Sequence, residues 1–150
     1  MSTKVLVIDD DPFLTDFLKD SLSQSSFEVF VSNSGTEGIK IIHQIQPDVV
    51  VLDLMMPGMS GWEVCKTIRM FSQVPILILS AVVDHELVMQ ALDNGADDYS
   101  GFYYGFKHCF KRYPYTKVRA DWGAGRHGSI YIYRDIIALS YILRGIQAQP

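Results

Sequence analysis

The chain has 150 residues, of which 48% are hydrophobic and 20% charged, and its formal net charge is −4. This size suits one compact domain, or one domain with an extension, and leaves little room for two independent cores. The acidic balance argues against the whole chain being a general nucleic-acid binder. No apolar run approaches the roughly 18 residues of a membrane span, and no secretion signal is recognisable, so a cytoplasmic location is expected.

Five short apolar runs alternate with helical patterns in the first two-thirds of the chain. Such runs, bounded by polar turns, are typical of strands that are buried on both faces of a parallel sheet. The predicted strands cover residues 4–9, 27–31, 48–53, 75–79 and 97–100. The alternation predicts an α/β fold in which helices lie on both faces of a parallel sheet.

Polar residues mark where the helices begin. Asp11 followed by Pro12 predicts the start of the first helix, because an aspartate can cap the helix and proline suits its first position. Two further pairs have the spacing of a capping box, in which each side chain accepts from the partner's backbone N–H. These pairs are Ser34 with Glu37, and Ser60 with Glu63.

A fourth helix is predicted near residues 84–94, beginning at Asp84 and ending near Gly95. Its expected buried face consists of Leu87, Val88, Ala91 and Leu92.

The two cysteines have different surroundings. Cys65 lies at helical spacing with Trp62 and Ile68, which favours a buried, reduced thiol. Cys109 follows His108, but no second close pair completes a set of four ligands, so a zinc site is not expected.

Carboxylates gather where two predicted strands end. Asp9 and Asp10 follow the run KVLVI, and Asp53 ends the run VVVLD. The carboxyl ends of parallel strands share one edge of a sheet, so these acids would meet there if their strands are neighbours. Three like charges packed together repel one another, and the arrangement makes sense mainly if a hard cation lies between them. We therefore predict a site for Mg²⁺ and a phosphoryl group.

In these motifs the chain resembles the receiver domain of two-component response regulators. The resemblance covers residues 1–99 and rests on the acid pair, Asp53, the MMPGMSG turn, Ser80 after the fourth run, and the GADDY run that ends at Tyr99. It implies a flavodoxin-like, doubly wound sheet of five parallel strands in the order 2-1-3-4-5. It also implies that a sensor histidine kinase or a phosphotransfer protein donates a phosphoryl group to Asp53.

The resemblance further implies roles for individual residues. Asp10 would bind Mg²⁺, with Asp9 as an accessory acid and the backbone carbonyl of Met55 as a further ligand. Ser80 would offer its hydroxyl to the phosphoryl group, and Tyr99 would be the aromatic residue that moves when the domain switches. Without the family pattern, Ser80 would be read as a turn residue and Tyr99 as a half-buried strand residue.

The resemblance ends after Tyr99. Receivers carry a lysine, followed by proline, that contacts the phosphoryl group, and this chain has Phe102 at the expected position. Residues 1–99 contain 5 Lys and Arg against 15 Asp and Glu, whereas residues 100–150 contain 8 against 2. Such a shift is compatible with a replaced segment, a fused segment or a segment read out of frame.

The tail, residues 100–150, is rich in aromatic and basic residues. Its strongest amphipathic pattern predicts a last helix near 135–146 that completes the domain, with Leu139 and Leu143 facing the sheet. The aromatic segment before it would cover a sheet edge or pair with a second copy, which would give a homodimer. Nucleic-acid contact is compatible with its composition, but a packing role is favoured because no recognition helix or RNA-binding signature can be matched.

Three kinds of function remain open. The favoured one is a receiver that accepts phosphate on Asp53 and is not an enzyme, apart from catalysing its own phosphorylation and dephosphorylation. The second is a degenerate receiver-fold binding module that is phosphorylated weakly or not at all, because the family lysine is missing. A metal-dependent phosphohydrolase is disfavoured, because Leu54 and Met55 follow Asp53 where a second acid would be needed for proton transfer.

Overall fold

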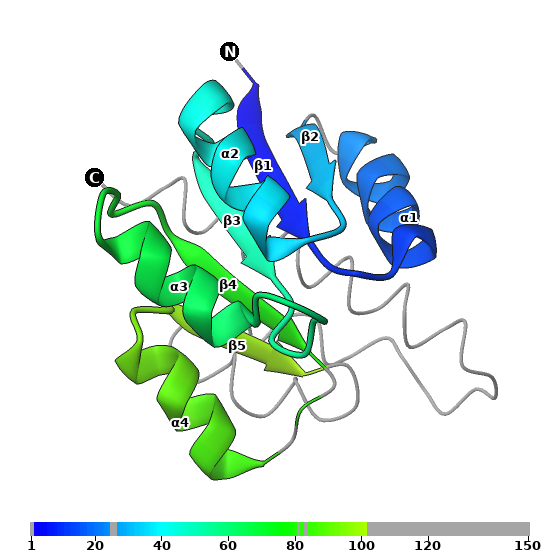
Figure 1. The fold of residues 1–150 in the computed structure, drawn as a ribbon. Coiled ribbons are helices and arrows are strands. Elements are labelled where there is room, and N and C mark those ends of the chain that lie inside the picture. Colours follow the sequence, from blue (N-terminus) through cyan, green and yellow to red (C-terminus); the bar gives the residue numbers. More distant parts are fainter. Residues whose placement is uncertain (1, 25–26, 81, 83, 102–150) are drawn as a thin grey trace, which may run out of the picture.

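The computed structural model describes residues 2–24, 27–80, 82 and 84–101. The predicted helix near 135–146, Phe102, His108 and Cys109 lie outside these residues. In chain order the described elements are β1 (Thr3–Ile8), α1 (Pro12–Ser23), β2 (Phe27–Ser32), α2 (Gly35–Ile45), β3 (Val49–Leu52), α3 (Gly61–Arg69), β4 (Ile76–Ser80), α4 (His85–Asp93) and β5 (Asp98–Gly101), as labelled in Figure 1.

The five strands form one parallel sheet in the order β2-β1-β3-β4-β5, which confirms the predicted topology. Each strand bound lies within one residue of its prediction. β1 ends at Ile8 and β3 at Leu52, so Asp9 and Asp53 come directly after their strands rather than at the last strand position. The backbone N–H of Asp53 donates to the carbonyl of Ile8 at 2.9 Å, so the two acid-bearing ends are tied together.

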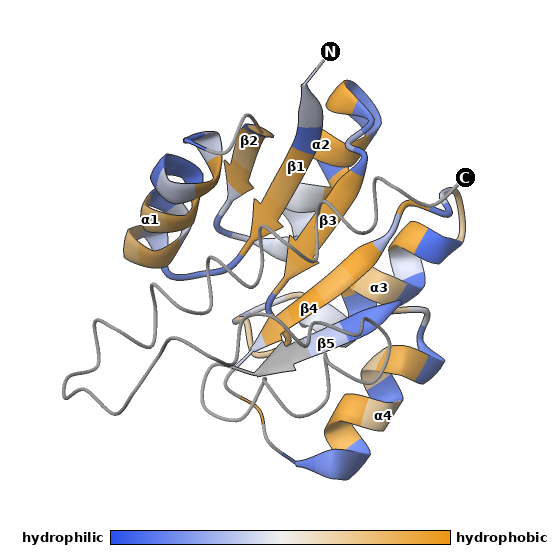
Figure 2. Cartoon of the chain, turned by 180° about the vertical axis from the view of Figure 1, so that it is seen from behind, coloured by the Kyte–Doolittle hydropathy of each residue, from blue (hydrophilic) through white to orange (hydrophobic). Residues whose placement is uncertain are grey.

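The sheet is buried on both faces, as its continuous apolar runs predict. Val5 and Val7 of β1 face one side, where they pack with Leu18 of α1. Leu6 and Ile8 face the other side, where α2, α3 and α4 contribute to the core. Figure 2 views the molecule from behind and shows the apolar colour along β1, β3 and β4, with α1 on that side. The core is thus divided into two layers by the sheet.

The helices α1 and α3 begin at the predicted caps, with the predicted hydrogen bonds. The Asp11 side chain accepts from the N–H groups of Phe13 at 3.0 Å and Leu14 at 3.4 Å, which confirms the cap of α1. Ser60 and Glu63 form the complete capping box, with distances of 2.8 and 3.3 Å. Both helices therefore begin at positions that local sequence determines.

The pair at the start of α2 forms only half of the predicted box. The Glu37 N–H donates to the Ser34 hydroxyl at 3.2 Å, as expected. The Glu37 carboxylate does not return to the backbone of Ser34, because it accepts a hydrogen bond from the Ser32 hydroxyl at 3.3 Å. Ser34 is still the cap, and its backbone N–H donates to the Ser32 hydroxyl at 3.4 Å in place of the Glu37 carboxylate.

The helix α4 begins after its cap Asp84, as predicted, and the chain leaves it at Gly95, whose φ of +109° suits glycine. Of the four residues expected to be buried, only Ala91 is fully so, and the other three are half-buried. The physical reason is position: α4 packs on α3 and on β5, the last strand of the sheet, and so has less cover than a central helix.

Cys65 of α3 is buried and is a free thiol, which confirms the expectation for this residue. Burial raises the pKa of this thiol to about 12, so it stays protonated at neutral pH. None of the helices in the described part of the chain has the length and apolarity needed to cross a bilayer.

Candidate functional site

Three carboxylates lie together at the carboxyl edge of the sheet. Asp9 and Asp10 follow β1, and Asp53 follows β3, which pairs with β1. One carboxylate oxygen from each residue lies within 4.8 Å of the others, close enough to hold a metal ion. The three predicted acids meet because their strands are neighbours. Carboxylate oxygens are the ligands that Mg²⁺ prefers, so the residues present fit this ion.

Asp9 is the most buried of the three acids, with 6% of its surface exposed. Its pKa is raised from 3.8 to about 7, mainly by burial and also by the negative charges of Asp53, Asp10 and Asp11. A hydrogen bond from the Asp11 backbone N–H, at 2.9 Å, opposes this rise. The same hydrogen bond fixes the turn that leads from β1 into α1.

Asp53 is half-buried between the loops at this edge. Burial raises its pKa, while hydrogen bonds from the Ser80 side chain and from the backbone N–H groups of Met55 and Leu54 lower it. The Ser80 hydroxyl oxygen in turn accepts from the backbone N–H of Val82 at 3.4 Å. Ser80 is thereby oriented toward the carboxylate that it would assist.

Tyr99 of β5 lies behind Ser80. Its hydroxyl donates to the carbonyl oxygen of Ser80 at 3.3 Å, and only 9% of its surface is exposed. Burial and the charge of Asp53 raise the pKa of Tyr99 to about 12. Asp53, Ser80 and Tyr99 therefore form a connected set that runs from the acid cluster into the sheet.

The loop after β3 brings the backbone of α3 against that of Asp53. The N–H of Gly61 donates to the carbonyl of Leu54 at 2.9 Å. A Cβ atom at Gly61 would overlap the carbonyl oxygen of Asp53 and lie 2.6 Å from the Cα of Leu54. Sequence reasoning missed this contact, and the glycine directly after the predicted cap Ser60 was the available signal.

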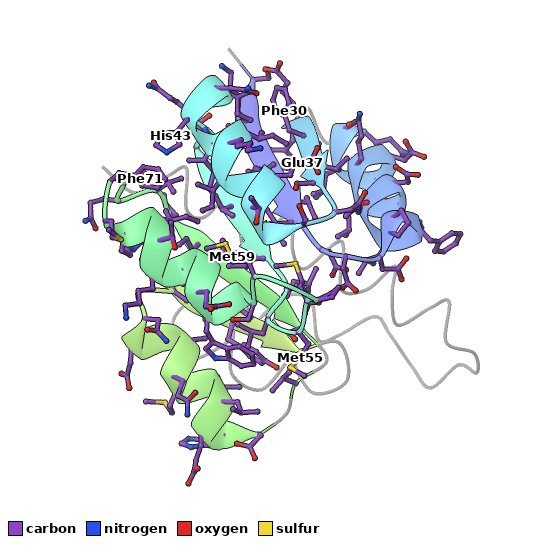
Figure 3. All side chains as sticks on the ribbon, in the orientation of Figure 1. Phe30, Glu37, His43, Met55, Met59 and Phe71 are labelled. Carbon is purple, nitrogen blue, oxygen red and sulfur yellow. The ribbon has the colours of Figure 1, made fainter. Side chains whose placement is uncertain are left out.

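Met55 projects from the same loop (Figure 3), and 61% of the surface of this residue is exposed. Its backbone N–H faces Asp53, whereas the predicted role of its carbonyl as a metal ligand stays a prediction.

Asn33 is a second residue that sequence reasoning missed. Its side-chain amide nitrogen donates to the backbone carbonyl of Asp9 at 2.8 Å and to the hydroxyl of Thr15 at 3.0 Å. No local pattern points to these contacts, because Asp9 is 24 residues away along the chain.

Comparison with known proteins agrees with this geometry. Residues 5–100 match the family model described as the response regulator receiver domain. The chain belongs to this receiver family. Receiver domains of response regulators are in general phosphoacceptors rather than enzymes acting on other substrates.

The chain is similar to the DNA-binding response regulator MtrA of Mycolicibacterium smegmatis, with 41% identity over 99 residues, which are 66% of this chain and 43% of the relative. It is also similar to the transcriptional regulatory protein AfsQ1 of Streptomyces coelicolor, with 41% identity over 95 residues, 63% of this chain and 42% of the relative. The receiver domain thus spans less than half the length of these curated relatives.

Among solved structures, the receiver domain of the Francisella response regulator 1452 matches with a TM-score of 0.63 and 34% identity, over 67% of this chain and 84% of that chain. The chemotaxis protein CheY4 of Vibrio cholerae matches with a TM-score of 0.65 and 29% identity, over 67% and 87%. Both matches cover about the portion of the chain that forms the described sheet and helices.

Proposed function

We propose that this receiver domain accepts a phosphoryl group on Asp53 from a phosphohistidine of a sensor histidine kinase or a phosphotransfer protein, with Mg²⁺ as cofactor. The observation that carries the proposal is the convergence of Asp9, Asp10 and Asp53 within 4.8 Å, with the Ser80 hydroxyl bonded to Asp53. Three acids at one point are unfavourable alone and become favourable around a divalent cation.

The proposed step is a displacement at phosphorus. A carboxylate oxygen of Asp53 attacks the phosphorus atom, the phosphorus–nitrogen bond breaks, and its electron pair returns to the imidazole of the partner. Mg²⁺, when bound, neutralises charge on the phosphoryl oxygens and aligns them for the transfer. Asp10 and Asp9 would hold the ion, and the N–H groups of Leu54 and Met55 keep Asp53 in place.

Ser80 and Tyr99 would carry the signal away from the site. The Ser80 hydroxyl, which is hydrogen-bonded to the Asp53 carboxylate, would donate to an oxygen of the new phosphoryl group. Movement of Ser80 would shift its backbone carbonyl, which accepts the hydrogen bond from the Tyr99 hydroxyl. The surface formed by β5 and by α4, which packs on it, would then change, and we propose that this change alters how a partner protein binds, as in other switches built from packed elements.

A second candidate is a receiver-fold binding module that is phosphorylated poorly. Phe102 favours it, because this residue replaces the lysine that the family places beside the phosphoryl group. Without that cation a phosphoryl group on Asp53 loses one charge-assisted hydrogen bond. The two candidates differ in the rate and extent of labelling rather than in the site.

Acetyl phosphate, a small phosphoryl donor, provides the test. The intact chain should gain one phosphoryl group in the presence of Mg²⁺ and none when the ion is chelated, as measured by intact-protein mass spectrometry. Asp53→Asn should abolish labelling. Asp93→Asn, a matched change at an exposed aspartate of α4, should leave it unaltered. Label that persists in Asp53→Asn would reject the proposed site.

A further inference from the structure

Asn33 connects two loops at the acidic edge of the sheet. It follows β2, whereas Asp9 follows β1. Both hydrogens of its side-chain amide have acceptors, since the nitrogen donates to the Asp9 carbonyl at 2.8 Å and to the Thr15 hydroxyl at 3.0 Å. The residue itself is exposed, so these bonds are made at the rim of the site rather than in the core.

The two bonds from Asn33 join the start of the loop that carries Asp9 and Asp10 to the first turn of α1, which follows that loop. One bond holds the Asp9 carbonyl, which belongs to the peptide that joins Asp9 to Asp10. The other holds Thr15 of α1, whose hydroxyl donates to the carbonyl of Pro12 at 3.1 Å in the first turn of the helix. Thr15 is fully buried, so this anchor is fixed by the core.

The loop needs such a constraint because its charges favour opening. Asp9, Asp10 and Asp53 have oxygens within 4.8 Å of one another, and their ionised forms repel. A lysine or arginine at position 33 would hold the loop but would also neutralise part of the charge. An amide is neutral, so it holds the backbone and leaves the carboxylates their full attraction for a cation.

We propose that Asn33 is a positioning residue, which holds the Asp9–Asp10 peptide so that both carboxylates are presented to a divalent cation before the cation arrives. This inference rests on the proposed function, since it concerns the same metal site. Residues that orient metal ligands from outside the coordination shell commonly change the affinity by about tenfold or more when they are removed.

The test compares Asn33→Ala with Asn94→Ala in the full chain. Asn94 is a matched control, because its side-chain amide also donates to a backbone carbonyl, that of Gln90 at 2.9 Å, at the end of α4. Titration with Mg²⁺ alone should show the half-saturating concentration rising about tenfold in Asn33→Ala. In Asn94→Ala it should equal that of the intact chain.

A second measurement separates positioning from a loss of folding. Acetyl-phosphate labelling of Asn33→Ala should be slow at low Mg²⁺ and should recover to within about twofold of the intact rate at saturating Mg²⁺. A rate that stays low at saturating Mg²⁺, in proportion to the unfolded fraction, would mean that Asn33 only stabilises the fold. An unchanged half-saturating concentration would also overturn the proposal.

Hydrogen exchange gives a readout that does not require the ion. The Asp11 N–H, which bonds to the Asp9 carboxylate, should exchange about tenfold faster in Asn33→Ala and at the intact rate in Asn94→Ala. If the intact chain binds no Mg²⁺, the proposed function is wrong. The exchange rate of the Asp11 N–H is then the remaining test of whether Asn33 holds the loop. Equal rates in the intact chain, Asn33→Ala and Asn94→Ala would reject that role.

Discussion

The carboxylates of Asp9 and Asp53 lie at the ends of two paired strands, with oxygens no more than 4.8 Å apart. Asp9 is buried and Asp53 is half-buried, and burial is the main cause of the raised pKa of each. Ionising these acids therefore lowers the stability of the fold when no cation is bound. Such unfavourable ionisation is common at sites whose residues serve binding rather than folding.

This relationship predicts how stability depends on pH. The folded chain keeps a proton on Asp9 up to about pH 7, whereas the unfolded chain loses it near pH 3.8. The folded state therefore binds more protons in this window, and the free energy of unfolding falls as the pH rises through it. The contribution is lost above about pH 7, where Asp9 is ionised in both states. The pKa of Asp53 is also raised in the folded chain, so its ionisation likewise lowers the free energy of unfolding as the pH rises.

The variant Asp9→Asn tests this dependence. It keeps the side-chain oxygen that accepts from Asp11 but cannot ionise. At pH 8, with Mg²⁺ chelated, we expect its melting temperature to exceed that of the intact chain by about 5 °C, and the difference to shrink toward pH 4. Circular dichroism melts at each pH measure this. A difference that is constant with pH would contradict the assignment, and the exposed Asp93→Asn is the control.

Removal of one charge should also separate metal binding from folding. Asp10→Asn should weaken Mg²⁺ binding at least about tenfold, because a direct carboxylate ligand of the proposed site is lost. Its melting temperature without Mg²⁺ should be equal or higher, since repulsion within the cluster is relieved. Isothermal titration and thermal melts measure the two quantities. Equal Mg²⁺ affinity in this variant would remove Asp10 from the site.

The acid cluster and the sheet were predictable because their signals are local. An apolar run that ends in a carboxylate predicts both the strand and an acid at its carboxyl end. That Asp9 and Asp10 meet Asp53 also required β1 and β3 to be neighbours, and this order came from the resemblance to the receiver family. The role of Gly61 and the bonds of Asn33 were missed, because they depend on the backbone approach of segments distant in the sequence.

The bond between Tyr99 and Ser80 predicts a modest effect on stability. Tyr99→Phe keeps the buried ring and removes the hydroxyl that donates to the Ser80 carbonyl at 3.3 Å. We expect the free energy of unfolding to fall by about 1 kcal/mol, which chemical denaturation can resolve. Mg²⁺ affinity should be unchanged, because Tyr99 is not among the clustered acids. A large loss of Mg²⁺ affinity would show that the residue supports the metal site directly.

Placing a lysine at position 102, where the family has one, tests the second candidate function, a binding module that is phosphorylated poorly. In Phe102→Lys an ammonium group would again be available to a phosphoryl oxygen. If the missing cation limits the site, this variant should be labelled by acetyl phosphate faster or more completely than the intact chain. Phe102→Leu, which adds no charge, is the control. Rapid and complete labelling of the intact chain would instead reject the idea of a weakened site.

The face of the sheet that carries α1 extends from β2 to β4. Leu77 and Leu79 of β4 belong to the core cluster on this face. Among the described helices α1 alone covers it, and α1 packs on β1 and β2. Leu77 and Leu79 are 0% and 4% exposed. If this face were left without cover, its apolar surface beside the edge strand β5 would favour association. We therefore expect residues 102–150, with the predicted helix near 135–146, to complete this face.

Deletion of residues 102–150 keeps the whole of β5 and tests that expectation. The shortened chain should aggregate, or melt at least about 5 °C lower than the intact chain, as judged by size-exclusion chromatography and thermal unfolding. A chain that lacks only residues 147–150, beyond the predicted helix, should behave as the intact protein. Leu139→Asp with Leu143→Asp in the full chain should reproduce the effect of the deletion, because two charges on the expected apolar face would prevent its burial. A shortened chain that stays monomeric with an unchanged melting temperature would mean that the tail is dispensable for the receiver fold.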